Sequence, residues 1–62
     1  MRFKLTYKTK SDLMERVFFY DMDSEEDHLL GELIYTNQST GRVLVIRRNE
    51  LDWYLIEAEN VN

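Results

Sequence analysis

The chain has 62 residues, no cysteine, one histidine (His28) and a formal net charge of −4. This length allows one domain, predicted to span residues 1–62, whose stability must come from packing because disulfides and a zinc site of several Cys and His ligands are excluded. The excess of carboxylates also removes the long-range attraction that binding to DNA or RNA requires.

The first half of the chain favours two strands. Residues 2–9 alternate apolar and polar side chains, which predicts a strand with one buried and one solvated face. Residues 14–22 (MERVFFYDM) are rich in β-branched and aromatic side chains, so they favour a second strand after a turn at 10–12. Asp12 and Glu15 have the spacing of a helix capping box, but a helix here would be apolar around nearly its whole circumference.

Residues 24–35 allow two interpretations. Ser24 and the acidic residues after it resemble a helix N-terminus, which favours a helix over 24–35. Gly31 interrupts that helix, and the polar turn 37–41 joins two β-prone apolar runs as in a hairpin. We therefore prefer a loop or single helical turn at 24–29 and a strand at 31–36.

The last third of the chain predicts two more strands. Residues 42–47 carry apolar side chains on both faces, which is typical of a central or barrel-like strand. Residues 48–50 form a polar turn, and residues 52–58 alternate as a final strand. Four apolar side chains of the predicted strands are expected in the core. They are Phe3, Leu5, Val45 and Ile56.

The predicted fold is all-β: a small five-stranded antiparallel meander that curls into a barrel. The alternative is an α+β fold, ββαββ, with a helix at about 24–35. The first strand is basic and the last is acidic, so we expect the two to lie side by side with opposite charges paired across them.

One resemblance supports the barrel. Phe19-Tyr20-Asp21, the acidic stretch after it and Gly31-Glu32-Leu33-Ile34 are similar to the opening of SH3-type barrels, and Leu55-Ile56 to Asn60-Val61 resembles their final strand. The tandem tryptophan of the third strand and the proline near the end are missing, and a whole strand precedes the match. The resemblance thus implies a small-barrel topology and not binding of proline-rich peptides.

The sequence argues against an enzyme. There is no cysteine nucleophile, and Ser11, Ser24 and Ser39 fall in predicted turns where serine commonly caps the backbone. His28 lies in an acidic segment with no partner residue that would fix it as a base. We expect no catalytic residue and no cofactor.

An acidic loop stands out between the second and third predicted strands. Its carboxylates follow the spacing of a calcium-binding loop, but Glu26 occupies the position where the sharp turn needs glycine, so we expect no metal site. Weak attraction of cations and mimicry of nucleic acid both remain open for this loop. Its members are Asp21, Asp23, Glu25, Glu26, Asp27 and Glu32.

The aromatic side chains favour a protein-interaction module. Phe18–Phe19 and Trp53–Tyr54 are adjacent pairs, and neighbours in a strand face opposite sides, so one member of each pair should reach the outer face. Tyrosine and tryptophan are enriched in binding hot spots. The candidate partner-binding residues are Phe19, Tyr20, Tyr35, Trp53 and Tyr54. The hypothesis is an accessory or inhibitory factor that binds a larger protein through aromatic and acidic surface.

Two other functions stay open. Arg2, Lys4 and Lys8 on the solvated face of the first strand, with a stacking aromatic, would suit a small barrel that binds nucleic acid, although the net charge makes nucleic acid a poor partner. An open sheet edge would suit a structural domain that forms homodimers or larger homo-oligomers. No apolar run has the length of a membrane span, and the N-terminus lacks a signal-peptide pattern, so we expect a cytoplasmic protein.

Overall fold

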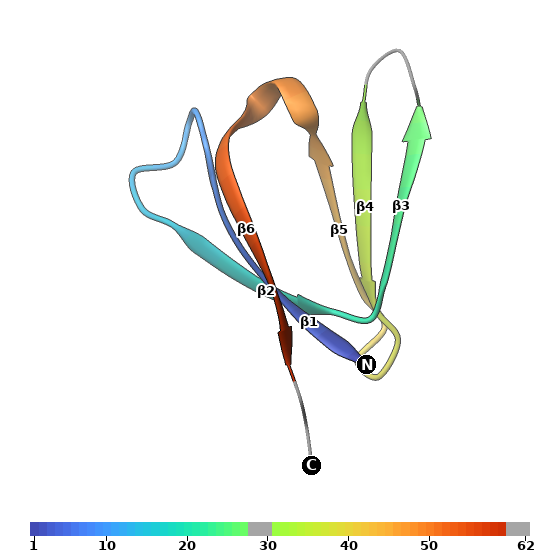
Figure 1. Cartoon of the computed structure of the whole chain (residues 1–62). Coiled ribbons are helices and arrows are strands. Elements are labelled where there is room, and N and C mark those ends of the chain that lie inside the picture. Colours follow the sequence, from blue (N-terminus) through green and yellow to red (C-terminus); the bar gives the residue numbers. More distant parts are fainter. Residues whose placement is uncertain (28–30, 60–62) are drawn as a thin grey trace.

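The computed structural model describes residues 1–27 and 31–59 and shows an all-β protein built of two three-stranded antiparallel sheets (Figure 1). The sheets have the strand orders β2–β1–β6 and β3–β4–β5. The strands are β1 (Arg2–Thr9), β2 (Arg16–Tyr20), β3 (Met22–Asp27), β4 (Glu32–Asn37), β5 (Arg42–Arg47) and β6 (Leu51–Glu59), with a 3₁₀ turn η1 (Arg48–Glu50) before β6. No helix in the described ranges is long and apolar enough to cross a membrane.

Strands β2 and β3 are two halves of one segment that bends at Asp21 and so joins the sheets. The bend is tied to the β4–β5 hairpin. The amide of Asp21 donates to the carbonyl of Thr36 at 3.0 Å, and the Asp21 carboxylate accepts from the amide of Gln38 at 3.1 Å. The side-chain amide of Asn37 donates to the carbonyl of Phe19 at 3.2 Å. These bonds satisfy backbone groups that the break in the strand would otherwise leave without partners.

The predicted pairing of the first and last strands is confirmed. Arg2 lies opposite Glu59 and Lys4 opposite Glu57 in the β1–β6 ladder. The Arg2 guanidinium forms an ion pair with Glu59 at 2.9 Å, and the Lys8 ammonium contacts the carboxylate of Asp52 at 3.2 Å. The basic first segment and the acidic last segment therefore lie in one sheet, where ion pairs between the two strands stabilise their register.

Side chains close the turn between β1 and β2. The Asp12 carboxylate accepts from the amide of Thr9 at 3.2 Å and from its hydroxyl at 2.7 Å, and it contacts Arg16 at 3.0 Å. The hydrogen bond from the Thr9 hydroxyl, assisted by the Arg16 guanidinium, holds the pKa of Asp12 below its ordinary value. Asp12 thus caps a turn between strands and not a helix.

The predicted hairpin at 37–41 is confirmed. The Asn37 side-chain oxygen accepts from the amides of Ser39 at 3.1 Å and Thr40 at 3.3 Å, and the Gly41 amide donates to the Asn37 carbonyl at 2.8 Å. Gly41 has φ +72°, a conformation in which a side chain is strained. The sequence thus fixes the turn through one Asn and one Gly.

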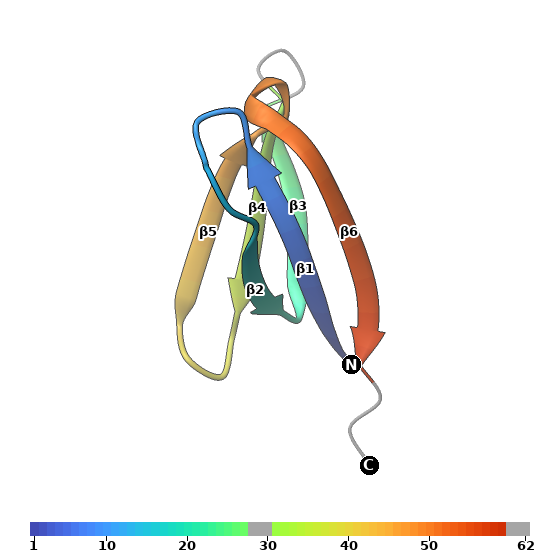
Figure 2. The same ribbon diagram turned by 90° about the vertical axis from the view of Figure 1, so that its left-hand side faces the viewer.

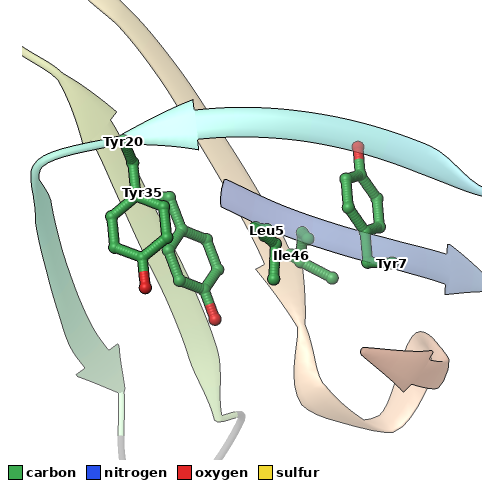
Figure 3. Packing of buried hydrophobic residues seen from close by; sticks show 5 residues of the cluster. All are labelled: Leu5, Tyr7, Tyr20, Tyr35 and Ile46. Atoms are coloured by element: carbon green, nitrogen blue, oxygen red, sulfur yellow. The ribbon is translucent and has the colours of Figure 1, made fainter. Parts of the chain in front are cut away.

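The core lies between the two sheets and consists of a few large side chains (Figure 3). The rings of Phe3 and Tyr20 stack with their centres 5.3 Å apart, and the ring centres of Tyr20 and Tyr35 are 4.8 Å apart. Aromatic rings from both sheets therefore meet at one end of the core. Leu5 and Ile46 pack beside them. The buried residues among those described are Leu5, Tyr7, Tyr20, Tyr35 and Ile46.

The region around residues 24–35 corrects the sequence interpretation. Residues 24–27 belong to strand β3 and not to a loop or helical turn, and β4 follows at Glu32, which excludes the alternative helix over 24–35. Residues 28 and 29 lie outside the described ranges. Met22–Asp27 has little intrinsic β preference, but its backbone pairs with β4 along its length, so a tertiary ladder overrides local propensity.

The prediction of a central position for β5 is wrong. β5 is an edge strand of its sheet, and β4 is the central strand. Val45, expected in the core, is exposed on the outer face of the β3–β4–β5 sheet. Ile56, also expected in the core, faces inward opposite Leu5, yet it remains 40% exposed because β6 is an edge strand as well. Phe3 and Leu5 are in or against the core as predicted.

Candidate functional site

Four apolar side chains lie on the outer face of the β2–β1–β6 sheet, the sheet nearer the viewer in Figure 2, and they flank the polar outward residues of β1. Residues directly opposite in an antiparallel ladder share a face. Thr6 lies between Val17 and Leu55, and Lys4 lies between Phe19 and Glu57. This outer apolar face therefore comprises Val17, Phe19, Trp53 and Leu55, whose side chains are between 37% and 54% exposed.

Arg2 spans this face. Its guanidinium lies 5.3 Å from the centre of the Phe19 ring on β2 and also binds the carboxylate of Glu59 on β6. A cation over an aromatic face is attracted by the ring quadrupole, and here the same cation is neutralised by a carboxylate. Arg2 thus links Phe19 on β2 to Glu59 on β6.

The sequence-predicted partner residues separate into two groups. Phe19, Trp53 and Tyr54 are exposed on the β2–β1–β6 sheet. Tyr20 and Tyr35 are buried in the core, where their rings contact each other. The enrichment of tyrosine in binding hot spots suggested a surface position, but the aromatic contacts between the sheets hold both rings inside. They support the exposed aromatics and do not offer contact surface themselves.

The adjacent aromatic pairs behave differently from each other. Phe18 packs against the core and Phe19 faces outward, as strand alternation predicts. Trp53 faces outward on β6, while Tyr54 faces inward opposite Tyr7 and is nevertheless 53% exposed. The inward face of β6 is only partly covered by the second sheet. Both faces of β6 therefore contribute exposed aromatic surface.

Two apolar residues of the outer face, Val17 and Leu55, were not among the predicted partner residues. They are aliphatic, and an aliphatic strand residue resembles core in any sequence pattern. Their position follows from register, since both lie opposite Thr6, a polar residue of the solvated face of β1. The alternation of β1 was the signal that would have identified them.

Burial of the two core tyrosines raises the pKa of both phenols. Desolvation is the main cause for Tyr20, with a smaller contribution from the carboxylate of Asp23. Desolvation, together with nearby Tyr20 and Tyr54, raises the pKa of Tyr35 to about 12. Each hydroxyl thus stays protonated well into the alkaline range in the folded protein.

These shifts predict a loss of stability at high pH. Because the pKa of Tyr35 is raised on folding, the unfolded chain loses this proton first, so the stabilisation is complete below pH 10 and falls between pH 10 and about 12. The expected loss from Tyr35 is about 1 kcal/mol at about pH 11. Urea unfolding across this range would measure it. Tyr35→Phe should flatten the decline, and an equally steep decline in that variant would assign it to other groups.

The acidic residues do not form one loop. Asp21 is at the bend, Asp23, Glu25 and Glu26 are exposed on β3, and Glu32 begins β4. Asp27 ends β3. Glu25 contacts the guanidinium of Arg48 at 3.3 Å. An extended strand spaces its carboxylates apart, so a set with calcium-loop spacing does not converge on one point. Within residues 1–27 and 31–59, no three His, Asp or Glu side chains gather closely enough to hold a metal ion.

A small hollow of about 180 Å³ opens between β1, the turn after it and β5. It is smaller than the about 300 to 1,000 Å³ of typical small-molecule sites. Of its three charged residues, Asp12 and Arg16 bind each other and so are not directed at a ligand, and the third is Glu50. His28 lies outside the described ranges. The hollow offers no nucleophile held by a base.

Comparison with protein-family models, with curated proteins and with solved structures gives no match.

Proposed function

We propose that this chain is a non-enzymatic protein-interaction module that binds a protein partner through its outer apolar face. The observation that carries the proposal is the exposure of Val17, Phe19, Trp53 and Leu55 on one face of one sheet. Apolar side chains gathered on a rigid sheet face are characteristic of partner surfaces, and aromatic residues dominate binding energy at such surfaces.

The charges around this face favour a partner with aliphatic side chains and little net charge. Arg2 is paired with Glu59, Lys8 with Asp52, and Lys4 lies opposite Glu57. A face whose cations are balanced by its own carboxylates has no strong preference for either sign of charge. An accessory or inhibitory role would follow from occupying the surface of a larger protein.

The same pairing weakens the nucleic-acid alternative. Phosphate binding gains affinity when Lys and Arg release counterions from the nucleic acid, and cations already paired with carboxylates contribute less to that release. Arg42 and Arg47 lie on β5, in the other sheet from the basic residues of β1, and Arg48 is paired with Glu25. A cysteine-free chain fits the reducing cytoplasm, where we propose the module acts.

The test is capture of a partner by tagged protein from a lysate treated with nuclease, followed by binding measured with the purified partner. Val17→Ser combined with Phe19→Ser removes two apolar side chains from β2 and should weaken partner binding by at least about tenfold. Trp53, the one tryptophan of the chain, reports binding on the same face by a blue shift of its fluorescence.

The matched control is Leu13→Ser combined with Met14→Ser. Both residues are exposed in the turn before β2, so this variant loses similar apolar surface elsewhere. It should bind the partner as well as the unaltered protein does. Equal binding by the Val17/Phe19 variant would disprove the proposed face. A partner that is lost on nuclease treatment would instead favour nucleic acid.

A further inference from the structure

Within the described part of the chain, two strand edges of opposite charge have no partner strand. β5 and β6 are edge strands of different sheets, joined by the short turn η1. In Figure 2 they lie at opposite sides of the molecule and run in opposite directions. An open edge presents backbone N–H and C=O groups that can pair with another strand.

The side chains of these edges are complementary. β5 carries Arg42 and Arg47 and no acid, while β6 carries Asp52, Glu57 and Glu59 and no base. The residues between the charges are apolar in both strands, and Val43, Val45, Trp53, Tyr54, Leu55 and Ile56 are exposed. Edge strands of monomeric proteins usually carry charged residues or proline that prevent pairing with another chain. The central parts of β5 and β6 carry neither.

In one antiparallel register of β5 with β6, both arginines of β5 lie opposite carboxylates of β6. When Arg42 lies opposite Glu57, the spacing of the residues places Arg47 opposite Asp52. All four pairs between them are apolar: Val43 with Ile56, Leu44 with Leu55, Val45 with Tyr54 and Ile46 with Trp53. Asp52 already contacts Lys8, but its side chain remains 51% exposed and can receive a second cation.

The faces of the strands agree with this register. Leu44 lies opposite Tyr35 and so faces inward on β5, while Leu55 faces outward on β6. In Figure 2 the sheet that contains β6 lies nearer the viewer than the sheet that contains β5, so the outer face of β6 and the inner face of β5 are turned in the same direction. Copies placed side by side in one orientation therefore bring these faces together, with the strands antiparallel.

Other pairings of the open edges are less favourable. β5 against β5 opposes arginines, and β6 against β6 opposes carboxylates, so symmetric dimers are disfavoured. β3 is also an edge, but Asp23, Glu25 and Glu26 run along it and would oppose the valines of β5. β2 carries a single charge, Arg16, and can form one such ion pair.

We propose that this chain self-associates head to tail, with the β5 edge of one copy pairing antiparallel with the β6 edge of the next. Each copy offers one β5 edge and one β6 edge, and these two edges bind different neighbours. The assembly is therefore a closed ring or an open chain of copies. The inference goes beyond the proposed function and does not depend on it. The outer apolar face continues from copy to copy, and repetition of that face would increase avidity for a partner.

Charge exchange tests the proposal through assembly mass, measured by light scattering after size-exclusion chromatography. The unaltered protein should elute at a multiple of 7.6 kDa and dissociate on dilution. Arg42→Glu with Arg47→Glu makes both edges acidic, and Asp52→Arg with Glu57→Arg makes both basic. Each variant alone should remain monomeric, and an equimolar mixture should assemble again. Circular dichroism checks that each variant is folded.

Engineered cysteines test the register independently and do not depend on the stability of the charge variants. The chain has no cysteine of its own. Under oxidation, Val43→Cys protein mixed with Ile56→Cys protein should form a disulfide-linked pair. Val43→Cys mixed with Trp53→Cys is the control, because three residues along a strand separate these positions by about 10 Å.

Either of two results would overturn the proposal. One is a mass of 7.6 kDa at every concentration of the unaltered protein. The other is assembly that survives in the Arg42/Arg47 variant. Preferred crosslinking of the control cysteines would overturn the antiparallel register. Assembly is measured on the protein without a partner. The variant Val17→Ser with Phe19→Ser leaves the β5 and β6 edges unchanged. A failure of partner binding can therefore be distinguished from a failure of assembly.

Discussion

Replacing Ile46 by aspartate should unfold the protein. Ile46 is 5% exposed on the inner face of β5 and belongs to the cluster of five buried side chains. A carboxylate there has no partner, so it must be buried charged or take up a proton, and either state costs about 4 kcal/mol or more. A domain of this size has a total stability of about 3 to 9 kcal/mol. Circular dichroism of dilute protein at neutral pH should show an unfolded chain.

The adjacent residue provides the matched control. Val45 lies on the same strand, faces outward and is 52% exposed. Val45→Asp introduces the same group into solvent and loses only β preference and some apolar contact, about 1 kcal/mol. The two variants differ by one position and should differ in whether the chain folds. Equal losses of stability would mean that a further layer covers the outer face of β5.

The pattern of β1 and the turn at 37–41 could be predicted because their signals are local. Alternation in β1 reports one solvated face, and Asn37 with Gly41 specifies a tight connection through its own hydrogen bonds. The pairing of β1 with β6 was also predictable, since Arg2 and Glu59 carry complementary charges that two distant segments can use only by lying side by side.

Strand β3 could not be predicted because its cause is not local. The acidic sequence Met22–Asp27 resembles a helix start, and only its ladder with β4 and the bend at Asp21 make it a strand. Gly31, which argued against a helix, has φ +63°, and its carbonyl accepts from the amide of Arg48 at 2.9 Å. The local signal at this glycine was correct, and the signal at Ser24 was overridden by tertiary pairing.

The sequence shows which apolar and aromatic residues could form the candidate site, but it does not show which of them the second sheet covers. The sequence shows that β5 is apolar on both faces, and this pattern is typical of a central or barrel-like strand. Whether a second layer covers an apolar face depends on strand order, which the pattern does not contain. Val45 and Ile56 were therefore expected in the core, while Tyr20 and Tyr35 were expected at the surface.

Replacing Leu5 by alanine should remove most of the stability of the fold. Leu5 is 0% exposed and lies between Phe18 and Ile56 in the ladders on either side of β1. Removing its branched side chain leaves a cavity in a core of few residues, and such changes cost about 2 to 5 kcal/mol. That range approaches the total stability of a small domain. In urea unfolding, the midpoint should fall by about 2 M or more, or the variant should be unfolded without denaturant.

Replacing Leu55 by alanine is the matched control, because it removes the same atoms from an exposed position. Leu55 is next to Ile56 on β6, but it faces outward and is half exposed. Leu55→Ala should therefore cost about 1 kcal/mol or less in dilute, monomeric protein. If Leu55→Ala were as damaging as Leu5→Ala under those conditions, the outer face would be part of the monomer core and could not be the partner surface. A small effect on stability with weaker partner binding would assign Leu55 to the outer apolar face.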